Sequence, residues 1–554
     1  MKRLDTSFAR AVPALLPLWD NANIALIGCG SVGSWLAPSI VRLAKAVEQR
    51  LPGQAVNISL IDPARVDRRD LVRRNFCEAD VDRPKAEALA ERYGAAWGME
   101  ITAIPQPFQS EQLRHNSGYN NVSIGVVCTQ DEQALAECDK FSAWQHYNFD
   151  TGAARLWQLD CHRLGDQGRV ILGSCQAPKE ALRRAFSMPT FCKILPPVPS
   201  LPPVSRDLPD SSPLKEARAL VEGQIVAAEA ADYLLRLITA TLRRFETRLD
   251  LSDGRAVSRY VTPEAVLKGR QPRQSADPEQ RRAVPLPPLS GNVRFVVVGC
   301  GGTGSWLLPG LARIARAMRE SGQTVEVLCV DPDHVEEANI TRQNFCEAEI
   351  GLPKAETLAR RMSPIFGGAI KAITARFEPE MIADFRGESL VLTGCVDNYV
   401  SRRQMERALS VFGRGQSAPA VWWLDCGNGR DNGQVLIGSA TQVEQLKAAF
   451  RAPGRCATLR VPAPSLQHPE LLQPGRGNEP RRTSCEHLLL ASAQSLMVNQ
   501  RTAATAAGML FRLAEGSLNT YAAYFDLPSG TAHPRFISRN NVAAAVGMDP
   551  RCLR

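Results

Sequence analysis

The sequence predicts an α/β protein made of two tandem copies of one large domain. Two observations predict this fold class: the same motifs recur at an offset of about 270 residues, and each copy opens with a strand, a glycine-rich turn, a helix and a second strand. The composition is that of a folded globular protein, with 44% hydrophobic and 22% charged residues. A chain of 554 residues is long enough to bury a core in each copy.

The repeat is clearest in its glycine-rich segment. GCGSVGSWLAP begins at Gly28 and GCGGTGSWLLP begins at Gly299. NFCEA and PKAE follow at matching distances in both halves, and the similarity extends as far as Cys192 and Cys456. The duplication therefore covers most of each half. We expect a first domain at residues 1–262, a second at 291–554, and between them a proline-rich, exposed linker at 263–290.

The opening of the second copy predicts a nucleotide site. A β-branched strand at 294–298 leads into the glycines, a helix follows at 305–319, and a strand at 325–330 ends in Asp331. In a Rossmann-like unit of this kind, glycines let backbone amides approach phosphate and the carboxylate accepts hydrogen bonds from ribose. The expected nucleotide-binding residues are Gly299, Gly301, Gly302, Gly304 and Asp331. The first copy has the same order, with Asp62 as the carboxylate.

The residues beyond Asp331 distinguish among nucleotide-binding families. Asn339, Arg342-Gln343, Lys354-Ala355 and Asp397-Asn398 follow in that order. This pattern resembles the ThiF/MoeB/ubiquitin-activating-enzyme superfamily over residues 292–517, and more loosely over 21–244. The resemblance implies two tandem Rossmann-like ThiF-type adenylation domains that form an intramolecular pseudo-dimer. The tandem arrangement looks like the activating enzyme of a bacterial ubiquitin-like conjugation system, and the second half is also similar to PRTRC-system ThiF proteins.

The resemblance implies roles for these residues and two cofactors, ATP and Mg²⁺. Arg342 and Lys354 are expected to contact phosphates, Gln343 to position the nucleotide and Asp397 to bind magnesium. Asn339 and Asn398 match further positions of the family's nucleotide site. Positive charge and a metal ion suit a reaction in which a carboxylate attacks the α-phosphate and pyrophosphate leaves.

The first copy departs from this pattern at several of these places, although it keeps the lysine as Lys85. Gln130 stands at the position of Asp397, and a neutral amide is a poorer magnesium ligand than a carboxylate. The other departures are Asp131 for Asn398, Arg74 for Gln343, Asp70 for Asn339 and Ser31 for Gly302. We therefore expect the first copy to be inactive, unless a register shift lets Asp131 replace the missing carboxylate.

Two further residues follow from the resemblance. The inactive half of such enzymes contributes an N-terminal arginine to the partner's ATP, which points to Arg10, with Arg3 as a competitor. Cys485 is the expected thioester nucleophile, because it precedes a helical run at 488–513 and has no counterpart in the first copy. Cys456 is the alternative, and the absence of any cysteine intermediate is a third reading.

The expected substrate partner is a ubiquitin-like protein whose C-terminal tail enters the site, with a conjugating enzyme as acceptor. The net charge of +9 is spread among acidic residues, so we expect no nucleic-acid partner. We also expect no membrane partner and a cytoplasmic location, since no long apolar run or leader pattern occurs. The alternatives are an adenylyltransferase for a sulfur-carrier-like protein or peptide without a cysteine intermediate, an oxidoreductase, and a non-catalytic assembly protein.

Overall fold

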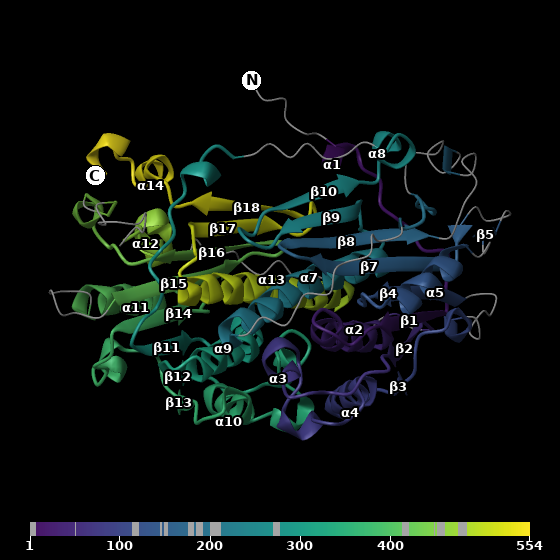
Figure 1. The fold of residues 1–554 in the computed structure, drawn as a ribbon, viewed down its shortest axis with the longest axis horizontal. Coiled ribbons are helices and arrows are strands. Elements are labelled where there is room, and N and C mark those ends of the chain that lie inside the picture. Colours follow the sequence, from purple (N-terminus) through teal and green to yellow (C-terminus); the bar gives the residue numbers. More distant parts are fainter. Residues whose placement is uncertain are drawn as a thin grey trace.

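In a computed structural model, the chain forms one continuous mixed sheet of 16 strands with helices packed against it (Figure 1). The structure describes residues 7–49, 51, 53–113, 121–143, 147–148, 153–174, 182–183, 192–199, 212–269, 277–412, 420–447, 449–450, 460–474 and 485–553. The α/β class expected from the sequence is confirmed.

The first half builds one series of elements after a short helix α1 (Ser7–Arg10). Its strands are β1 (Asn21–Ile27), β2 (Ala55–Ile61), β3 (Ile101–Ile104), β4 (Asn121–Val127), β7 (Leu156–Leu164), β8 (Gln167–Ser174), β9 (Arg244–Asp250) and β10 (Ala256–Tyr260), with the small pair β5 (Tyr147–Asn148) and β6 (Ala153–Ala154) apart from the main sheet. Its helices are α2 (Gly33–Glu48), α3 (Asp70–Arg73), α4 (Lys85–Trp97), α5 (Glu132–Ala143), α7 (Pro213–Ile238) and α8 (Pro263–Leu267).

The second half repeats this series. Its strands are β11 (Asn292–Val298), β12 (Thr324–Val330), β13 (Lys371–Ile373), β14 (Ser389–Gly394), β15 (Ala420–Asn428), β16 (Asn432–Gly438), β17 (Thr520–Asp526) and β18 (Thr531–Phe536). Its helices are α9 (Gly302–Glu320), α10 (Lys354–Phe366), α11 (Tyr399–Phe412), α12 (Pro464–Gln467), α13 (Cys485–Glu515) and α14 (Arg539–Ala545). Each strand and helix of the expected βαβ unit is present, although the helix begins three residues earlier than predicted.

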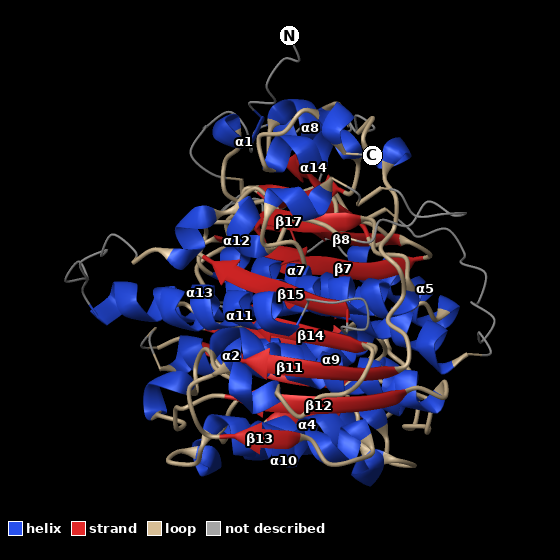
Figure 2. Cartoon of the chain, turned by 90° about the vertical axis from the view of Figure 1, so that its left-hand side faces the viewer, coloured by secondary structure: helices blue, strands red, loops and turns tan. Residues whose placement is uncertain are grey.

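The strand order explains how the halves join. The order is β3-β2-β1-β4-β7-β8-β9-β10 in the first half and β13-β12-β11-β14-β15-β16-β17-β18 in the second. In each series the first five strands are parallel and the rest antiparallel. The two sheets meet edge to edge where β10 pairs with β18 through Ala256 and Ala532. Figure 2 shows the second series stacked from β13 up to β17.

Four helices bury the interface between the halves. Helix α7 contacts α9 and α13, and α13 also contacts α9 and α2, so that these helices lie together between the two arms of the sheet (Figure 1). The apolar face of α9 predicted from the sequence is fully buried at Leu307, Leu311 and Ile314. Buried ion pairs also cross the interface, such as Arg501 Nη1 to Glu229 Oε2 at 3.1 Å. The two halves therefore form the intramolecular pseudo-dimer that the sequence predicted.

The proline-rich segment between the halves is less exposed than predicted. Leu286 and Leu289 are buried. The amide of Val284 donates to the carbonyl of Ile537 at 2.9 Å, and that of Leu286 donates to the carbonyl of Leu518 at 2.8 Å. The prediction of an exposed segment was wrong here because leucines alternate with prolines, whose fixed backbone keeps the chain extended along the second half. Among the described residues, no helix is long and apolar enough to cross a membrane.

Candidate active site

The glycine turn of the second half is set by its backbone. Gly299 has φ +92°, a left-handed conformation that favours glycine. A Cβ on Gly304 would lie 1.9 Å from the carbonyl oxygen of Gly299, so only glycine fits where α9 crosses β11. The first half has the same geometry at Gly28 and Gly33. These glycines are therefore required by the fold of both copies, whether or not each copy is active.

Asp331 holds this turn in place from the end of β12. Its Oδ2 accepts a hydrogen bond from the amide of Cys300 at 2.5 Å, and its Oδ1 accepts one from the amide of Asp333 at 2.8 Å. Burial raises the pKa of this carboxyl above its ordinary value. Asp62 makes the equivalent bonds to Cys29 and Ala64. Each carboxylate oxygen keeps a second lone pair that could accept a further donor.

Gln343 is the residue whose bonding is incomplete. It is only 5% exposed, and its side chain lies over the glycine turn, where a Cβ on Gly301 would be 3.7 Å from Nε2. Its Oε1 is buried and has no hydrogen-bond partner among the residues that the structure describes. A buried polar atom without a partner is costly, and one that faces a glycine turn fits a site that a ligand completes. Asn339 shapes the same loop, because its Oδ1 accepts from the amide of Glu336 at 3.0 Å.

The two predicted phosphate-binding cations belong to this loop and to the helix that follows it. Lys354 begins α10 and is buried, and its Nζ pairs at 3.3 Å with Asp333, whose side chain is 66% exposed. Because water reaches the carboxylate of this pair, the ammonium can exchange this partner for a ligand. Arg342 is exposed and makes no ion pair within the described part of the chain. Both cations are thus available to an anion.

The predicted magnesium ligand follows β14. Asp397 is exposed, and Asn398 beside it caps α11 by accepting from the amide of Ser401 at 2.9 Å. The backbone of this loop is held by Arg402, which is buried, donates to the carbonyl of Val396 at 2.8 Å and pairs with Asp425 at 3.1 Å. This clamp fixes the backbone immediately before Asp397.

The described residues contain no group of three or more His, Cys, Asp or Glu side chains that could hold a metal by themselves. Magnesium in nucleotide enzymes is commonly held by one or two carboxylates together with substrate phosphates. The single exposed carboxylate of Asp397 fits that mode of binding.

Two asparagines that the sequence analysis did not select also belong to this site. Asn499, from α13, lies against the turn so closely that a Cβ on Gly302 would be 2.9 Å from its Nδ2. Asn428, at the end of β15, donates to Asn499 Oδ1 at 2.5 Å. The glycine at position 302 therefore makes room for Asn499. The signals in the sequence were that Ser31 replaces this glycine in the first copy and that both asparagines belong to the segments that resemble PRTRC-system ThiF proteins.

The first copy places different side chains around the same turn. Lys85, the counterpart of Lys354, pairs at 3.0 Å with Asp70, which is buried, and Arg74 pairs with the same carboxylate at 2.5 Å. Gln130 donates to the carbonyl of Arg163 at 2.6 Å. Asp131 caps α5 by accepting from the amide of Ala134, which is the role of Asn398 in the second half. Asp131 thus aligns with Asn398 and not with Asp397, against the register shift considered above. A cavity of about 420 Å³ remains beside this turn.

Four sequence candidates lie apart from this cluster or outside the described residues. Helix α13 begins at Cys485, three residues before the predicted start at 488, and the side chain of Cys485 and all of Cys456 fall outside the described residues. Arg10 is exposed and pairs at 3.7 Å with Glu264 of α8, in the first half. Its contact with the second site therefore stays a prediction, and Arg3 lies outside the described residues.

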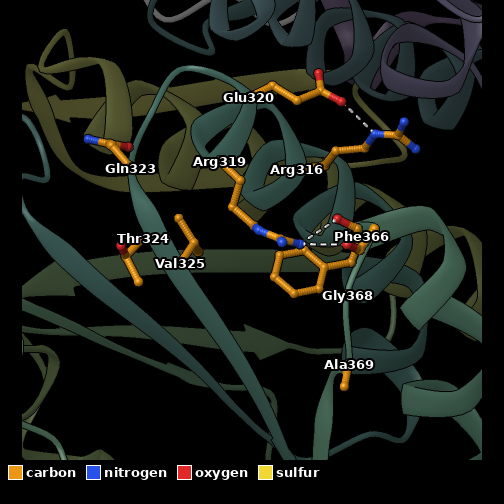
Figure 3. A pocket seen from close by; sticks show the side chains of 10 residues that line it. Arg316, Arg319, Glu320, Gln323, Thr324, Val325, Phe366, Gly368 and Ala369 are labelled. Carbon is orange, nitrogen blue, oxygen red and sulfur yellow. Dashed lines mark hydrogen bonds and ion pairs between the residues drawn. The ribbon is translucent and has the colours of Figure 1, made fainter.

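A second pocket, of about 670 Å³, lies at the opposite end of α9 and is lined by Arg316 and Arg319 (Figure 3). Both arginines are engaged there. Arg319 donates to the carbonyl of Gly367 at 2.8 Å and stacks on Phe366, and Arg316 pairs with Glu320 at 2.8 Å. Their role is to hold the end of α10, and the pocket contains none of the residues of the glycine turn.

Residues 8–132 and residues 290–414 each match the model of the ThiF family. The chain carries two ThiF-family domains. The resemblance inferred from the sequence is confirmed, and the ThiF segments contain the glycine turns and Gln343, Lys354 and Asp397. Asn428 and Asn499 lie beyond the second ThiF match.

Solved structures similar to this chain include several of MccB. The structure of E. coli MccB is 16% identical with a TM-score of 0.30, and the match covers 47% of this chain and 66% of that one. E. coli MccB with ATP is 17% identical with a TM-score of 0.29, and the match covers 45% of this chain and 64% of that one. The microcin C7 biosynthetic enzyme MccB in complex with N-formylated MccA is 17% identical with a TM-score of 0.29, and the match covers 45% of this chain and 65% of that one. The chain thus spans slightly less than two thirds of these proteins. None of the curated proteins compared with the sequence matches it.

Proposed function

We propose that the second half uses ATP and magnesium to adenylate a carboxylate. One observation carries the proposal: the glycine turn, the incompletely bonded Gln343, the weakly paired Lys354 and the exposed Asp397 follow neighbouring strands of one parallel sheet. In sheets of this kind, ligands bind at the carboxyl ends of the strands, where these residues lie. Membership in the ThiF family of adenylyltransferases supports this chemistry.

The residues take roles that their positions allow. Arg342 and Lys354 bind the phosphates and balance the negative charge that grows as pyrophosphate leaves. Gln343 and Asp331 orient the nucleotide, the first through the unpartnered Oε1 and the second through its remaining lone pairs. Asp397 would hold Mg²⁺, which when bound neutralises phosphate charge. An oxygen of the substrate carboxylate forms a bond to the α-phosphorus while the bond from that phosphorus to the bridging oxygen breaks.

The proposed substrate is the C-terminal carboxylate of a ubiquitin-like protein. In the next step the thiolate of Cys485 attacks the acyl carbon and AMP leaves, which gives a thioester for transfer to a conjugating enzyme. The position of Cys485 at the first residue of α13 supports this, because a helix N-terminus stabilises a thiolate. Cys456 is the second candidate thiol, and Arg10 is proposed to reach the ATP from the first half.

The alternative is an adenylyltransferase for a sulfur-carrier-like protein or a peptide that stops at the adenylate. One observation favours it: Cys300 and Cys426, two described cysteines close to the turn, are poor nucleophiles. A hydrogen bond with Cys329, together with burial, raises the pKa of the Cys300 thiol well above its ordinary range, and a bond with Cys395 does the same for Cys426. The thioester therefore depends on Cys485 or Cys456.

The test is ATP–pyrophosphate exchange with candidate ubiquitin-like proteins and peptides, followed by a non-reducing gel. The proposal expects magnesium-dependent exchange and a thiol-sensitive adduct that Cys485→Ala removes while exchange continues. Loss of the adduct in Cys456→Ala instead would reassign the thiol. Exchange without an adduct in the wild type supports the alternative. Absence of exchange with every acceptor, or full exchange in Asp397→Ala, would overturn both.

A further inference from the structure

One arginine of the first half reaches into the nucleotide site of the second. Arg42 lies on α2 and is 5% exposed. Its Nη2 donates to the carbonyl of Phe345 at 3.2 Å, and its Nη1 donates to the carbonyl of Gln343. Gln343 is the residue whose side chain covers the glycine turn. The two ends of this contact are separated by 301 residues in the chain.

The guanidinium is held rigidly between the halves. It lies over the ring of Trp97 from the first half at 4.5 Å and over that of Trp306 from the second half at 4.8 Å. Burial lowers the pKa of Arg42 to about 9. A planar cation between two aromatic faces has little freedom, and its fork matches two neighbouring carbonyls. Few other side chains could occupy this position.

The carbonyls bound in this way belong to the loop that carries the nucleotide residues. Trp306 Nε1 donates to the carbonyl of Arg342 at 3.4 Å. The amide of Asn344 donates to Ser305 Oγ at 2.9 Å, and its side chain donates to the carbonyl of Ser305 at 3.1 Å. The backbone from 342 to 345 is thus tied to α9 on one side and to Arg42 on the other. Movement of Arg42 would shift the loop that presents Arg342 and Gln343.

The chain offers a matched control, because Arg313 on α9 is the counterpart of Arg42. Arg313 is buried to the same degree, lies over Trp35 at 5.1 Å, and donates to the carbonyls of Leu71 at 3.0 Å and Phe76 at 2.8 Å. Burial also lowers its pKa to about 9. It therefore supports the corresponding loop of the first half, where Asp70 and Arg74 replace the nucleotide residues.

We propose that Arg42 is a positioning residue for the ATP site of the second half. The first half, in addition to its structural role, supplies the side chain that fixes the backbone of Gln343. This inference rests on the proposed adenylation function. Since a displacement of about 1 Å can cost an enzyme roughly 10²-fold in rate, loss of this contact is expected to lower activity substantially.

The experiment compares Arg42→Met with Arg313→Met. Both remove a buried cation at equivalent places, so thermal unfolding should move by similar amounts. In magnesium-dependent ATP–pyrophosphate exchange, Arg42→Met is expected to raise the KM for ATP and to lower kcat/KM on the order of 10²-fold. Arg313→Met should stay within about 3-fold of the wild type, because the loop it supports carries no nucleotide residue.

Equal losses of exchange in the two variants, or no loss in either, would overturn the inference. If either methionine variant fails to fold, Arg42→Lys and Arg313→Lys take their place, since lysine keeps the charge but cannot bridge both carbonyls. Arg42→Lys is then expected to raise the KM for ATP while Arg313→Lys leaves it near the wild-type value. Equal KM values in the two lysine variants would also overturn the inference. A wild-type protein that shows no exchange would reject the proposed function itself, which separates the two failures.

Discussion

The two glycine turns of this molecule have the same backbone but place the neighbouring lysine in different ion pairs. In both, a left-handed glycine begins the turn and a buried aspartate accepts two backbone amides. In the second half, the lysine of α10 pairs only with the exposed Asp333. In the first half, Ala64 stands at that place, and the lysine of α4 is paired with the buried Asp70.

Under the proposed function, this difference explains how a duplicated site keeps its fold without the same chemistry. One carboxylate, Asp70, pairs with both Lys85 and Arg74, so that an incoming phosphate must compete with it for each cation. The clamp formed by Arg402 and Asp425 is also missing, because the first half has Leu135 at the position of Arg402. Gly28 and Gly33, which the packing requires, are the same in both halves, whereas Ser31 replaces Gly302.

The largest expected effect is at the magnesium position. Asp397→Asn should lower the rate of ATP–pyrophosphate exchange on the order of 10²–10⁴-fold. This corresponds to a rise of several kcal/mol in the activation free energy. The matched change Gln130→Ala in the first half should leave exchange near the wild-type rate. Comparable losses in both variants would show that the first site also takes part in the chemistry.

The two lysines should separate activity from stability. Lys354→Met should lower exchange roughly 10²-fold, because it removes a cation that faces the phosphates, and it should change the free energy of unfolding little. Lys85→Met should do the reverse, since it leaves Asp70 with one of its two cations and costs about 1–3 kcal/mol. Exchange kinetics and urea unfolding on both variants test this contrast. A loss of exchange in Lys85→Met alone would contradict it.

Asp70→Asn tests whether the carboxylate of Asp70 is what keeps anions out of the first site. Without the carboxylate, the buried Lys85 and the half-buried Arg74 lose their shared partner, and the free energy of unfolding should fall by roughly 3 kcal/mol. Inorganic phosphate should then raise the melting temperature of the variant more than that of the wild type, because an anion can replace the carboxylate. Equal responses to phosphate would mean that the first site is closed to anions for another reason.

The smallest expected effect depends on pH. Glu222 of α7 pairs with Arg163 at 2.7 Å, next to the first turn. Burial raises the pKa of Glu222 to about 7, although Arg163 opposes this. The folded state therefore binds the proton more tightly than the unfolded state. The stabilisation, on the order of 2 kcal/mol, is complete below the ordinary carboxyl pKa and is lost as the pH rises through 7.

Glu222→Gln should remove this part of the pH dependence. Urea unfolding between pH 5 and pH 8 measures it, with the wild type as reference. On α13 of the second half, Val498 lies close to the position that corresponds to Glu222 on α7. Valine carries no ionisable group, so this position adds no pH dependence. An unchanged slope in the variant would assign the pH dependence to other groups.

The sequence predicted the fold class, the duplication and most of the residues around the second turn. This was possible because glycine spacing and short motifs act locally, and because a parallel sheet brings the ends of its strands together. The pairing of Lys85 with Asp70 was not predictable in detail, since the substitution at position 70 shows a lost asparagine but not which cations the new carboxylate binds. Asn499 and Arg42 were missed because each reaches the turn from a distant helix.

The prediction of an exposed linker failed for a related reason. Proline content indicates an extended chain, but it does not say whether the intervening leucines meet solvent or a neighbouring surface. Leu286 and Leu289 are buried, and the adjacent backbone is bonded to residues more than 200 positions away. Local composition alone could not provide that information.

The late position of α13 in the chain has a consequence for how the protein is made. Asn499 reaches the turn at Gly302 from a helix that is translated long after Arg42 and the rest of the first half. At typical rates of translation, the first half waits on the order of tens of seconds for its partner. During that interval the edge of β10 and the surface of α7 have nothing to pair with. The nascent first half therefore exposes a strand edge and a helix face that the second half later covers.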